Sequence, residues 1–205
     1  MLRRNLRGGQ AQGGPIQGGY SLVELLVVIT LTIMIAVPLV VFSYKGMTSY
    51  EFLQAQSNTS TELSTLSARI AKVVRGTTGV VSAQNNTLTL YGYFSPQDSV
   101  VKKIRYFIVG NNLEIGVTPP TGSAPNYTYN AADEVVTISR VDLSMGTNPM
   151  FTYFDDSGNQ LPNGFNVSQI KAIGIYVAAN PRTKQLSVPV AVSTRVTLRN
   201  FKTNL

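Results

Sequence analysis

The sequence predicts an α+β protein in which a long N-terminal helix packs on an antiparallel β-sheet or sandwich-like head. Three observations support this prediction. An almost unbroken apolar run occupies residues 20–42, an amphipathic helical pattern follows over residues 63–73, and strand-like segments separated by turns fill the remainder. We therefore expect four parts: a leader (1–19), a transmembrane half of the helix (20–43), an amphipathic upper half (44–76) and the β-rich head (77–205).

The composition disfavours an enzyme. Of the 205 residues, 13% are charged, and none is cysteine or histidine. The chain therefore lacks disulfides, thiolate nucleophiles and the residue that most often serves as general base or metal ligand. The formal net charge of +7 includes Arg3, Arg4 and Arg7, so the chain beyond residue 19 is only mildly basic. Without cysteine and histidine, we expect no catalysis and no cofactor. Because no dense Lys/Arg stripe is present, we expect no nucleic-acid partner.

The apolar run predicts a membrane anchor. From Tyr20 to Phe42 the chain carries a single charge, Glu24. A helix needs about 20 apolar residues to cross a bilayer, whereas the apolar core of a secretory signal has about 7–15. No Ala-x-Ala cleavage site follows the run, so we expect the anchor to be retained. The arginines that precede the run predict a cytoplasmic N-terminus and a head outside the membrane.

Glu24 needs an explanation, because a carboxylate at the centre of the hydrocarbon costs about 2.5–3.5 kcal/mol. One explanation is that Glu24 lies only one turn into the run and reaches the hydrated headgroups. The other is that Glu24 follows Tyr20 by four residues and shares its helix face. If the chain were cut after Gly19, the new ammonium group of Tyr20 could neutralise the carboxylate, within one helix or between neighbouring helices.

The stretch Gly19-Tyr20-Ser21-Leu22-Val23-Glu24, with the apolar run behind it, resembles the N-terminal signature of type IV pilins and type II secretion pseudopilins. Tyr20 stands where that family usually has phenylalanine. The resemblance implies that prepilin peptidase cleaves after Gly19 and that Tyr20, the new terminus, is N-methylated. It also implies that Glu24 pairs with the terminal amine of a neighbouring subunit. The implied partners are other pilins or pseudopilins through the N-terminal helix, the peptidase, the inner-membrane assembly platform and, before assembly, the lipid bilayer.

Within the helix, Pro38 lacks an N–H, so we expect a kink or local loosening there. We expect the helix to run from about Tyr20 to about Val74, with fraying over residues 57–61 and Gly76 near its end.

The upper half of the helix has an apolar stripe. Four residues recur at i, i+3, i+7 and i+10, which predicts an amphipathic helix with one face buried against a sheet. A parallel coiled coil is the alternative, but the stripe lasts too few heptads for one. The stripe consists of Leu63, Leu66, Ile70 and Val73.

The rest of the chain is punctuated like an antiparallel β domain, and it shows no internal repeat. Because Asn111 and Asn112 tolerate positive φ, we expect a hairpin turn at residues 110–112. Residues 118–132, rich in proline, glycine and asparagine, are expected to form a long loop. The expected strands lie within residues 87–94, 101–109, 113–117, 134–143, 150–156, 168–178 and 186–200.

The C-terminal part is similar to larger minor pilins and to the J-type minor pseudopilin in segments 151–159, 170–175 and 194–200. These resemblances imply a minor subunit, present in few copies or at the tip of a type IV pilus or type II secretion pseudopilus. Two alternatives stay open. One is a subunit of a DNA-uptake (competence) pilus, and the other is an unrelated single-pass surface protein whose β head binds a ligand.

Asp155, Asp156 and Asn159 have the oxygen density of a calcium loop. They lack the alternating acidic frame and the distal glutamate of such loops, so a hairpin turn is the expected explanation and no metal site is predicted.

A small basic cluster, Lys102, Lys103 and Arg105, lies on an expected strand. A solvated strand face, or an edge protected by lysine, is the commoner reason for such a cluster. Asn-x-Ser/Thr sequons occur at Asn58, Asn86, Asn126 and Asn166.

Overall fold

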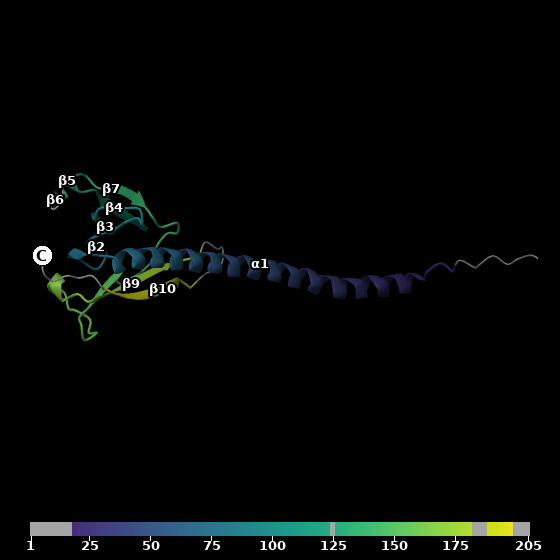
Figure 1. Cartoon of the computed structure of the whole chain (residues 1–205). Coiled ribbons are helices and arrows are strands. Elements are labelled where there is room, and N and C mark those ends of the chain that lie inside the picture. Colours follow the sequence, from purple (N-terminus) through teal and green to yellow (C-terminus); the bar gives the residue numbers. More distant parts are fainter. Residues whose placement is uncertain (1–17, 124–125, 182–187, 199–205) are drawn as a thin grey trace, which may run out of the picture. The chain divides into compact units, whose positions relative to one another are not determined.

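The structure is a computed structural model that describes residues 18–123, 126–181 and 188–198. The chain divides into two compact units, residues 1–49 and residues 50–205. Helix α1 (Leu22–Arg75) begins in the first unit and ends in the second, and all the described strands follow it (Figure 1). The basic residues of the leader, Arg3, Arg4 and Arg7, lie outside the described residues.

Helix α1 starts two residues later than expected, at Leu22, and ends at Arg75. It is continuous, so the fraying expected over residues 57–61 is wrong. Two hydroxyls in this stretch donate to carbonyls four residues earlier, which keeps their polar groups satisfied inside the helix. Thr59 Oγ1 lies 2.9 Å from the carbonyl of Ala55, and Thr61 Oγ1 lies 2.9 Å from that of Ser57. Gly76 follows the last turn, as expected.

The second unit buries the expected stripe of α1. Leu63 and Ile70 are fully buried, and Leu66 is 5% exposed. Val73 is only partly buried, whereas Val74 is fully buried. The difference follows from the 3.6-residue period, since position 74 lies closer than position 73 to the direction shared by Leu63 and Ile70.

Two antiparallel sheets and a small hairpin make up the β structure. The first sheet has the order β1 (Gly79–Ala83), β2 (Thr87–Gly92), β3 (Lys102–Val109), β4 (Asn112–Thr118) and β7 (Glu134–Thr137). The second sheet has the order β10 (Val190–Thr197), β9 (Ala172–Ala179) and β8 (Phe151–Phe154), and the hairpin pairs β5 (Thr121–Ser123) with β6 (Asn126–Thr128). A 3₁₀ helix, η1 (Val167–Gln169), precedes β9.

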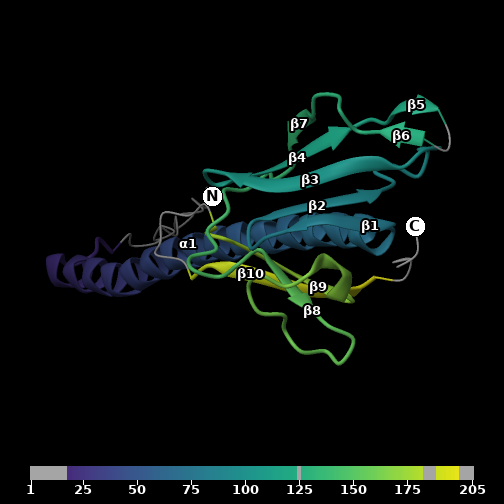
Figure 2. The ribbon, with the colours of Figure 1, turned by 90° about the vertical axis from the view of Figure 1, so that its left-hand side faces the viewer.

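Both sheets share one core with the C-terminal half of α1. Within the second unit, the five-stranded sheet lies on one side of the helix and the three-stranded sheet on the other (Figures 1 and 2). Ser67, 1% exposed on the helix, makes a 3.0 Å hydrogen bond with Thr194 of β10, so this buried hydroxyl is satisfied across the interface. The expected α+β class, a long helix packed on an antiparallel head, is confirmed.

Several strand expectations need correction. Strand β1 was not expected, because its five residues show no clear alternation of apolar and polar positions. The expected loop at 118–132 contains the β5–β6 hairpin. The segment 134–143 forms a strand only over β7, and Leu143 makes an isolated bridge to Ala179. Part of the last expected strand, residues 186, 187, 199 and 200, lies outside the described residues.

The β3–β4 turn is built differently from the expectation. Val109 pairs with Asn112, which leaves a two-residue turn at Gly110 and Asn111. Gly110 has φ 59°, and no described residue other than glycine has a positive φ. Glycine at the first central position is the requirement of a type II′ turn, so Gly110, and not Asn111 or Asn112, supplies the left-handed backbone.

The buried stripe predicts the effect of truncation. Leu63→Ala is expected to lower the free energy of unfolding of the head by about 2–5 kcal/mol, because it leaves a cavity beside fully buried neighbours. Urea unfolding of the full chain in a non-ionic detergent, followed by circular dichroism, measures this change. Ser64→Ala, on the exposed side of the same turn, is the control and is expected to change the free energy little. Equal unfolding midpoints for both variants would contradict the assigned stripe.

Candidate functional site

The first turn of α1 is closed by Ser21. The backbone N–H of Glu24 donates to Ser21 Oγ at 3.2 Å, and the N–H of Leu25 donates to the carbonyl of Ser21 at 3.1 Å. This is the geometry of a helix N-cap, in which a serine side chain satisfies an N–H that has no helical partner. The helix therefore begins immediately after Tyr20–Ser21.

Gly19, Tyr20 and Glu24 lie together at this end. The Tyr20 side chain is 82% exposed, and Gly19 and Glu24 are also exposed. Glu24 occupies the third position of the helix, where the partial positive charge of the N-terminus stabilises a carboxylate by about 0.3–1 kcal/mol. Among the described residues, Glu24 forms no ion pair. The side chain is thus accessible to a partner from another molecule.

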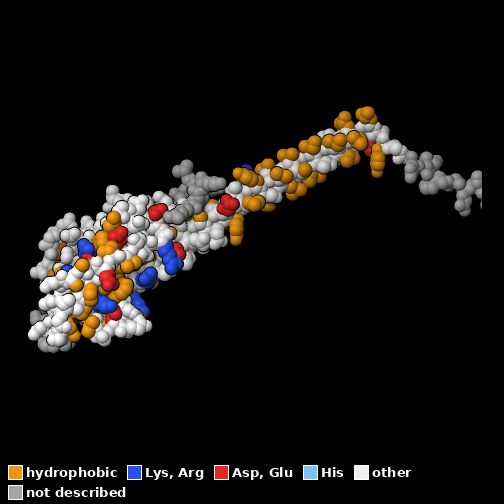
Figure 3. All heavy atoms as spheres, turned by 90° about the horizontal axis from the view of Figure 1, so that it is seen from above, with side chains coloured by type: hydrophobic (Ala, Val, Ile, Leu, Met, Phe, Trp, Pro, Cys, Tyr) orange, Lys and Arg blue, Asp and Glu red, His pale blue; other side chains and the backbone are white. Residues whose placement is uncertain are grey.

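The helix beyond this turn is apolar on every side. Each large apolar side chain from Leu22 to Tyr44 is at least 47% exposed. Figure 3 shows these side chains along the helix, with few charges among them. A soluble helix normally buries one such face and exposes a polar one. Here the whole circumference is apolar, which is typical of a helix that lies among lipids or other apolar helices.

The threonine hydroxyls inside this stretch are satisfied within the helix itself. Thr30 Oγ1 donates to the carbonyl of Leu26 at 2.8 Å, and Thr32 Oγ1 donates to that of Val28 at 2.7 Å. Internal satisfaction of this kind is what a helix surrounded by hydrocarbon requires. α1 continues through Pro38, which leaves the carbonyl of Met34 without its usual helical donor. The expected kink at Pro38 stays a prediction.

Among the described residues, one helix, α1, is long and apolar enough to cross a membrane. No part of its most apolar stretch is buried.

The calcium-loop candidate forms a closed turn after β8. Asp155 Oδ1 accepts the backbone N–H of Asn159 at 2.8 Å, and the N–H of Asp155 donates to the carbonyl of Asn159 at 3.0 Å. Gly158 has φ 85°, which suits the tight turn. Asp156 lies on the outside of the turn and is exposed. Among the described residues, no group of three or more acidic side chains comes together in a way that could hold a metal ion.

Two members of the basic cluster, Lys102 and Arg105, form ion pairs with acids. Lys102 Nζ lies 2.7 Å from Asp98, and Arg105 Nη2 lies 2.7 Å from Asp133. The Arg105 guanidinium also lies 4.4 Å from the centre of the Phe107 ring. β3 is the central strand of its sheet, so the explanation of a lysine-guarded edge is wrong.

Three of the four sequon asparagines have structural partners. Asn58 Oδ1 accepts from Gln54, and Asn86 Oδ1 accepts the backbone N–H of Met150. Asn166 caps η1 through a reciprocal pair of hydrogen bonds with Ser168 and Gln169. Asn126 lies in the exposed strand β6.

The N-terminal turn and the exposed apolar helix therefore form the candidate site. No protein-family model matches this chain, and no curated protein matches it either.

A pH prediction follows from Asp133. The hydroxyl of Thr118 donates to its carboxylate, and Arg105 and Lys103 lie near it; together they hold the pKa of Asp133 below the usual 3.8, although partial burial acts in the opposite direction. A lowered pKa in the folded state means that the ionised carboxylate stabilises the head above about pH 4 and that this contribution is lost as the pH falls further.

Asp133→Asn is therefore expected to lower the free energy of unfolding by about 1 kcal/mol at pH 7 and to have a smaller effect near pH 2. Urea unfolding midpoints of the full chain at both pH values check this expectation. Glu134→Gln, an exposed neighbour on β7, is the matched control. A Glu134→Gln effect as large as that of Asp133→Asn at pH 7 would contradict the role given to the Asp133 contacts.

Proposed function

We propose that this chain is a minor pilin or pseudopilin, a structural subunit that polymerises through its N-terminal helix. The observation that carries the proposal is the N-terminal turn, in which Gly19, Tyr20, a capping Ser21 and the unpaired Glu24 precede a wholly exposed apolar helix. The β head supplies the outward surface of the subunit, at low copy number or at the tip of a type IV pilus or type II secretion pseudopilus.

The exposed apolar surface of the helix determines which environment the subunit needs before and after assembly. Burying apolar surface is worth about 25 cal/mol per Å², so side chains that are half exposed along more than twenty residues strongly favour a non-aqueous environment. The bilayer provides that environment for the new subunit, which is held with its N-terminus in the cytoplasm. Neighbouring helices provide it after assembly, when the subunit leaves the membrane.

Proteolysis creates the charge that assembly uses. Hydrolysis of the Gly19–Tyr20 bond by prepilin peptidase leaves a carboxylate on the leader and an ammonium on Tyr20, and N-methylation keeps the positive charge. Ser21 already caps the helix, so removal of the leader does not take away the cap. The ammonium of one subunit and Glu24 of its neighbour then neutralise each other, and this pairing sets the register between helices because either charge alone is costly to bury.

The single-pass surface protein is the second candidate, because an exposed apolar helix suits an anchor as well as a filament subunit. It requires neither cleavage at Gly19 nor a charge at Glu24. A DNA-uptake role is less well supported, since the strand cations Lys102 and Arg105 are each paired with an acid.

Cleavage distinguishes the two candidates. Incubation of the membrane-embedded full chain with a prepilin peptidase is expected to remove residues 1–19 and leave Tyr20 as the N-terminus, measured by intact mass and N-terminal sequencing. Gly19→Leu is expected to block cleavage. Gly14→Leu, in an earlier Gly-Gly pair of the leader, is the control and is expected to be cut like the native chain. An uncut native chain would favour the surface-protein alternative.

Glu24 tests the assembly step. Glu24→Ala or Glu24→Leu is expected to leave membrane insertion intact but to lower incorporation into filaments by about tenfold or more, because the ammonium of the neighbour is left unpaired in an apolar interface. Quantitative immunoblots of membrane and sheared-filament fractions measure both quantities. Glu51→Ala, a matched change on the same helix beyond the apolar run, should incorporate normally. Normal incorporation of the Glu24 variants would refute the pairing.

A further inference from the structure

Two adjoining hollows run along one flank of the C-terminal half of α1, within the second unit. The smaller has a volume of about 140 Å³ and the larger about 570 Å³. Arg69 and Ile138 line both, so the two hollows adjoin each other along the helix, between Thr61 and Gly76. We call the two hollows together the seam groove. The smaller lies between the helix and the chain that follows β7, and the larger also borders the β2–β3 connection, β3 and β4.

The length of the seam groove suits an extended peptide. With a rise of 1.5 Å per residue, the helix from Thr61 to Gly76 is about 22 Å long. An extended chain covers that distance with about six or seven residues, at about 3.3 Å each. The larger hollow is also within the range of about 300–1,000 Å³ that is typical of ligand sites.

The floor of the groove is apolar, and its rim is cationic. Val73 of the helix and Ile138 and Val141 after β7 are partly buried and form the accessible floor. The charged side chains that line the groove are three cations and one acid: Arg69, Lys72, Arg140 and Glu62.

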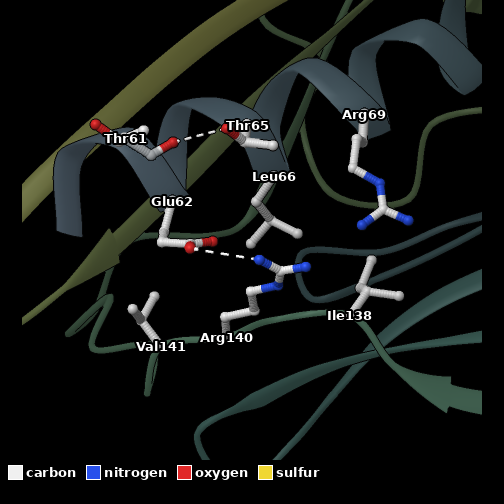
Figure 4. Close-up of a pocket in the computed structure, with 8 residues that line it drawn as sticks. All are labelled: Thr61, Glu62, Thr65, Leu66, Arg69, Ile138, Arg140 and Val141. Carbon is white, nitrogen blue, oxygen red and sulfur yellow. Dashed lines mark hydrogen bonds and ion pairs between the residues drawn. The ribbon is translucent and has the colours of Figure 1, made fainter. Parts of the chain in front are cut away.

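These cations are available to a ligand. Among the described residues, Arg69 and Lys72 form no ion pair. Arg140 lies 3.7 Å from Glu62, and its side chain is 79% exposed, so the pair is long and solvent-screened and contributes little. Figure 4 shows the guanidinium groups of Arg69 and Arg140 extending into the space below the helix, with only Arg140 joined to a partner.

One end of the groove carries uncovered aromatic surface. Tyr93 and Phe94, in the connection between β2 and β3, are 47% and 38% exposed. The carboxylate of Asp98 accepts the backbone N–H groups of Phe94 and Ser95 at 3.0 and 2.8 Å, which fixes this connection. The aromatic end is therefore held in place before any ligand arrives.

We infer that the seam groove binds an extended segment of a partner protein in which acidic side chains alternate with aromatic or aliphatic ones. Side chains of an extended chain point alternately to opposite sides. One set of side chains therefore meets the apolar floor and the aromatic end, while the other set meets Arg69, Lys72 and Arg140. A nucleic-acid strand fits less well, because its regularly repeated phosphates would also lie against Glu62.

The proposal is tested with the full chain in nanodiscs of neutral lipid. The probe is the peptide Glu-Phe-Glu-Leu-Glu-Phe-Glu, blocked at both ends and carrying an uncharged fluorophore, and its Gln-substituted counterpart is the control peptide. Anisotropy titrations are expected to show saturable binding of the acidic peptide that weakens with salt, and at least about tenfold weaker binding of the Gln peptide.

Variants of the chain locate the binding. Arg69→Gln is expected to weaken binding of the acidic peptide about tenfold. Arg75→Gln removes an equal charge from the same helix outside the groove and is expected to leave binding unchanged. Phe94→Ala is expected to weaken binding without changing its salt dependence, because it removes an apolar contact.

Three results would overturn the proposal. Equal affinity for the acidic and Gln peptides would remove the role of the cations. Equal losses with Arg69→Gln and Arg75→Gln would show attraction to a basic helix end in general. Concentration-dependent self-association of the nanodisc-free chain in detergent, abolished by Arg69→Gln and accompanied by no peptide binding, would assign the groove to a second copy of the chain.

Discussion

The structure depends on a helix whose first half cannot bury its own surface. From Leu22 to Tyr44 the hydroxyls of Thr30, Thr32 and Ser43 donate to carbonyls of the helix itself, but every large apolar side chain is exposed. Such a surface excludes water as a long-term environment and demands an apolar one. The single carboxylate in the stretch lies in the first turn, where the helix N-terminus already favours a negative charge. The proposed membrane insertion and the proposed filament assembly would each cover this apolar surface.

The apolar side chains in the second half of the same helix are buried within the chain itself. Its pattern changes from apolar on all sides to a stripe with a period of 3.6 residues, and that stripe enters a core shared by both sheets. The flank beside the stripe is polar and cationic, and it is only partly covered. One element thus has a face buried in the head, a flank that lines the seam groove and an N-terminal half whose apolar surface is exposed.

Local patterns in the sequence predicted the helix, its buried stripe and most of the strands. The predictions were wrong where a strand depends on its partner strand, or where a turn depends on the backbone of a single residue. Strand β1 shows no clear alternation of apolar and polar positions, and it forms because β2 provides a partner. At the β3–β4 turn the sequence offered glycine and two asparagines, and the register of the strands selected Gly110.

The candidate sites also differ in how much of each could be predicted from the sequence. The N-terminal signature is contiguous, so the sequence alone exposes it. One partner of the basic cluster is distant in the sequence: Asp133, just before β7, reaches Arg105 across β4, so the sequence shows this cation without the acid that pairs with it. The seam groove was missed entirely. Arg69 and Lys72 look like ordinary solvated residues until Ile138, Arg140 and the exposed aromatic rings are brought beside them.

The free energies involved show whether the helix N-terminus alone can stabilise the Glu24 carboxylate in an apolar environment. The Ser21 side chain caps the backbone N–H of residue 24, and it would do so whichever side chain that residue carried. The carboxylate itself gains only about 0.3–1 kcal/mol from the helix N-terminus. A carboxylate among apolar helices or deep in hydrocarbon costs about 2.5–3.5 kcal/mol. The difference of about 2 kcal/mol must come from headgroup hydration in the bilayer, and in a filament without headgroups from a cation. Among the described residues no basic side chain pairs with Glu24, whereas the proposed cleavage after Gly19 would produce an ammonium one turn away on every subunit.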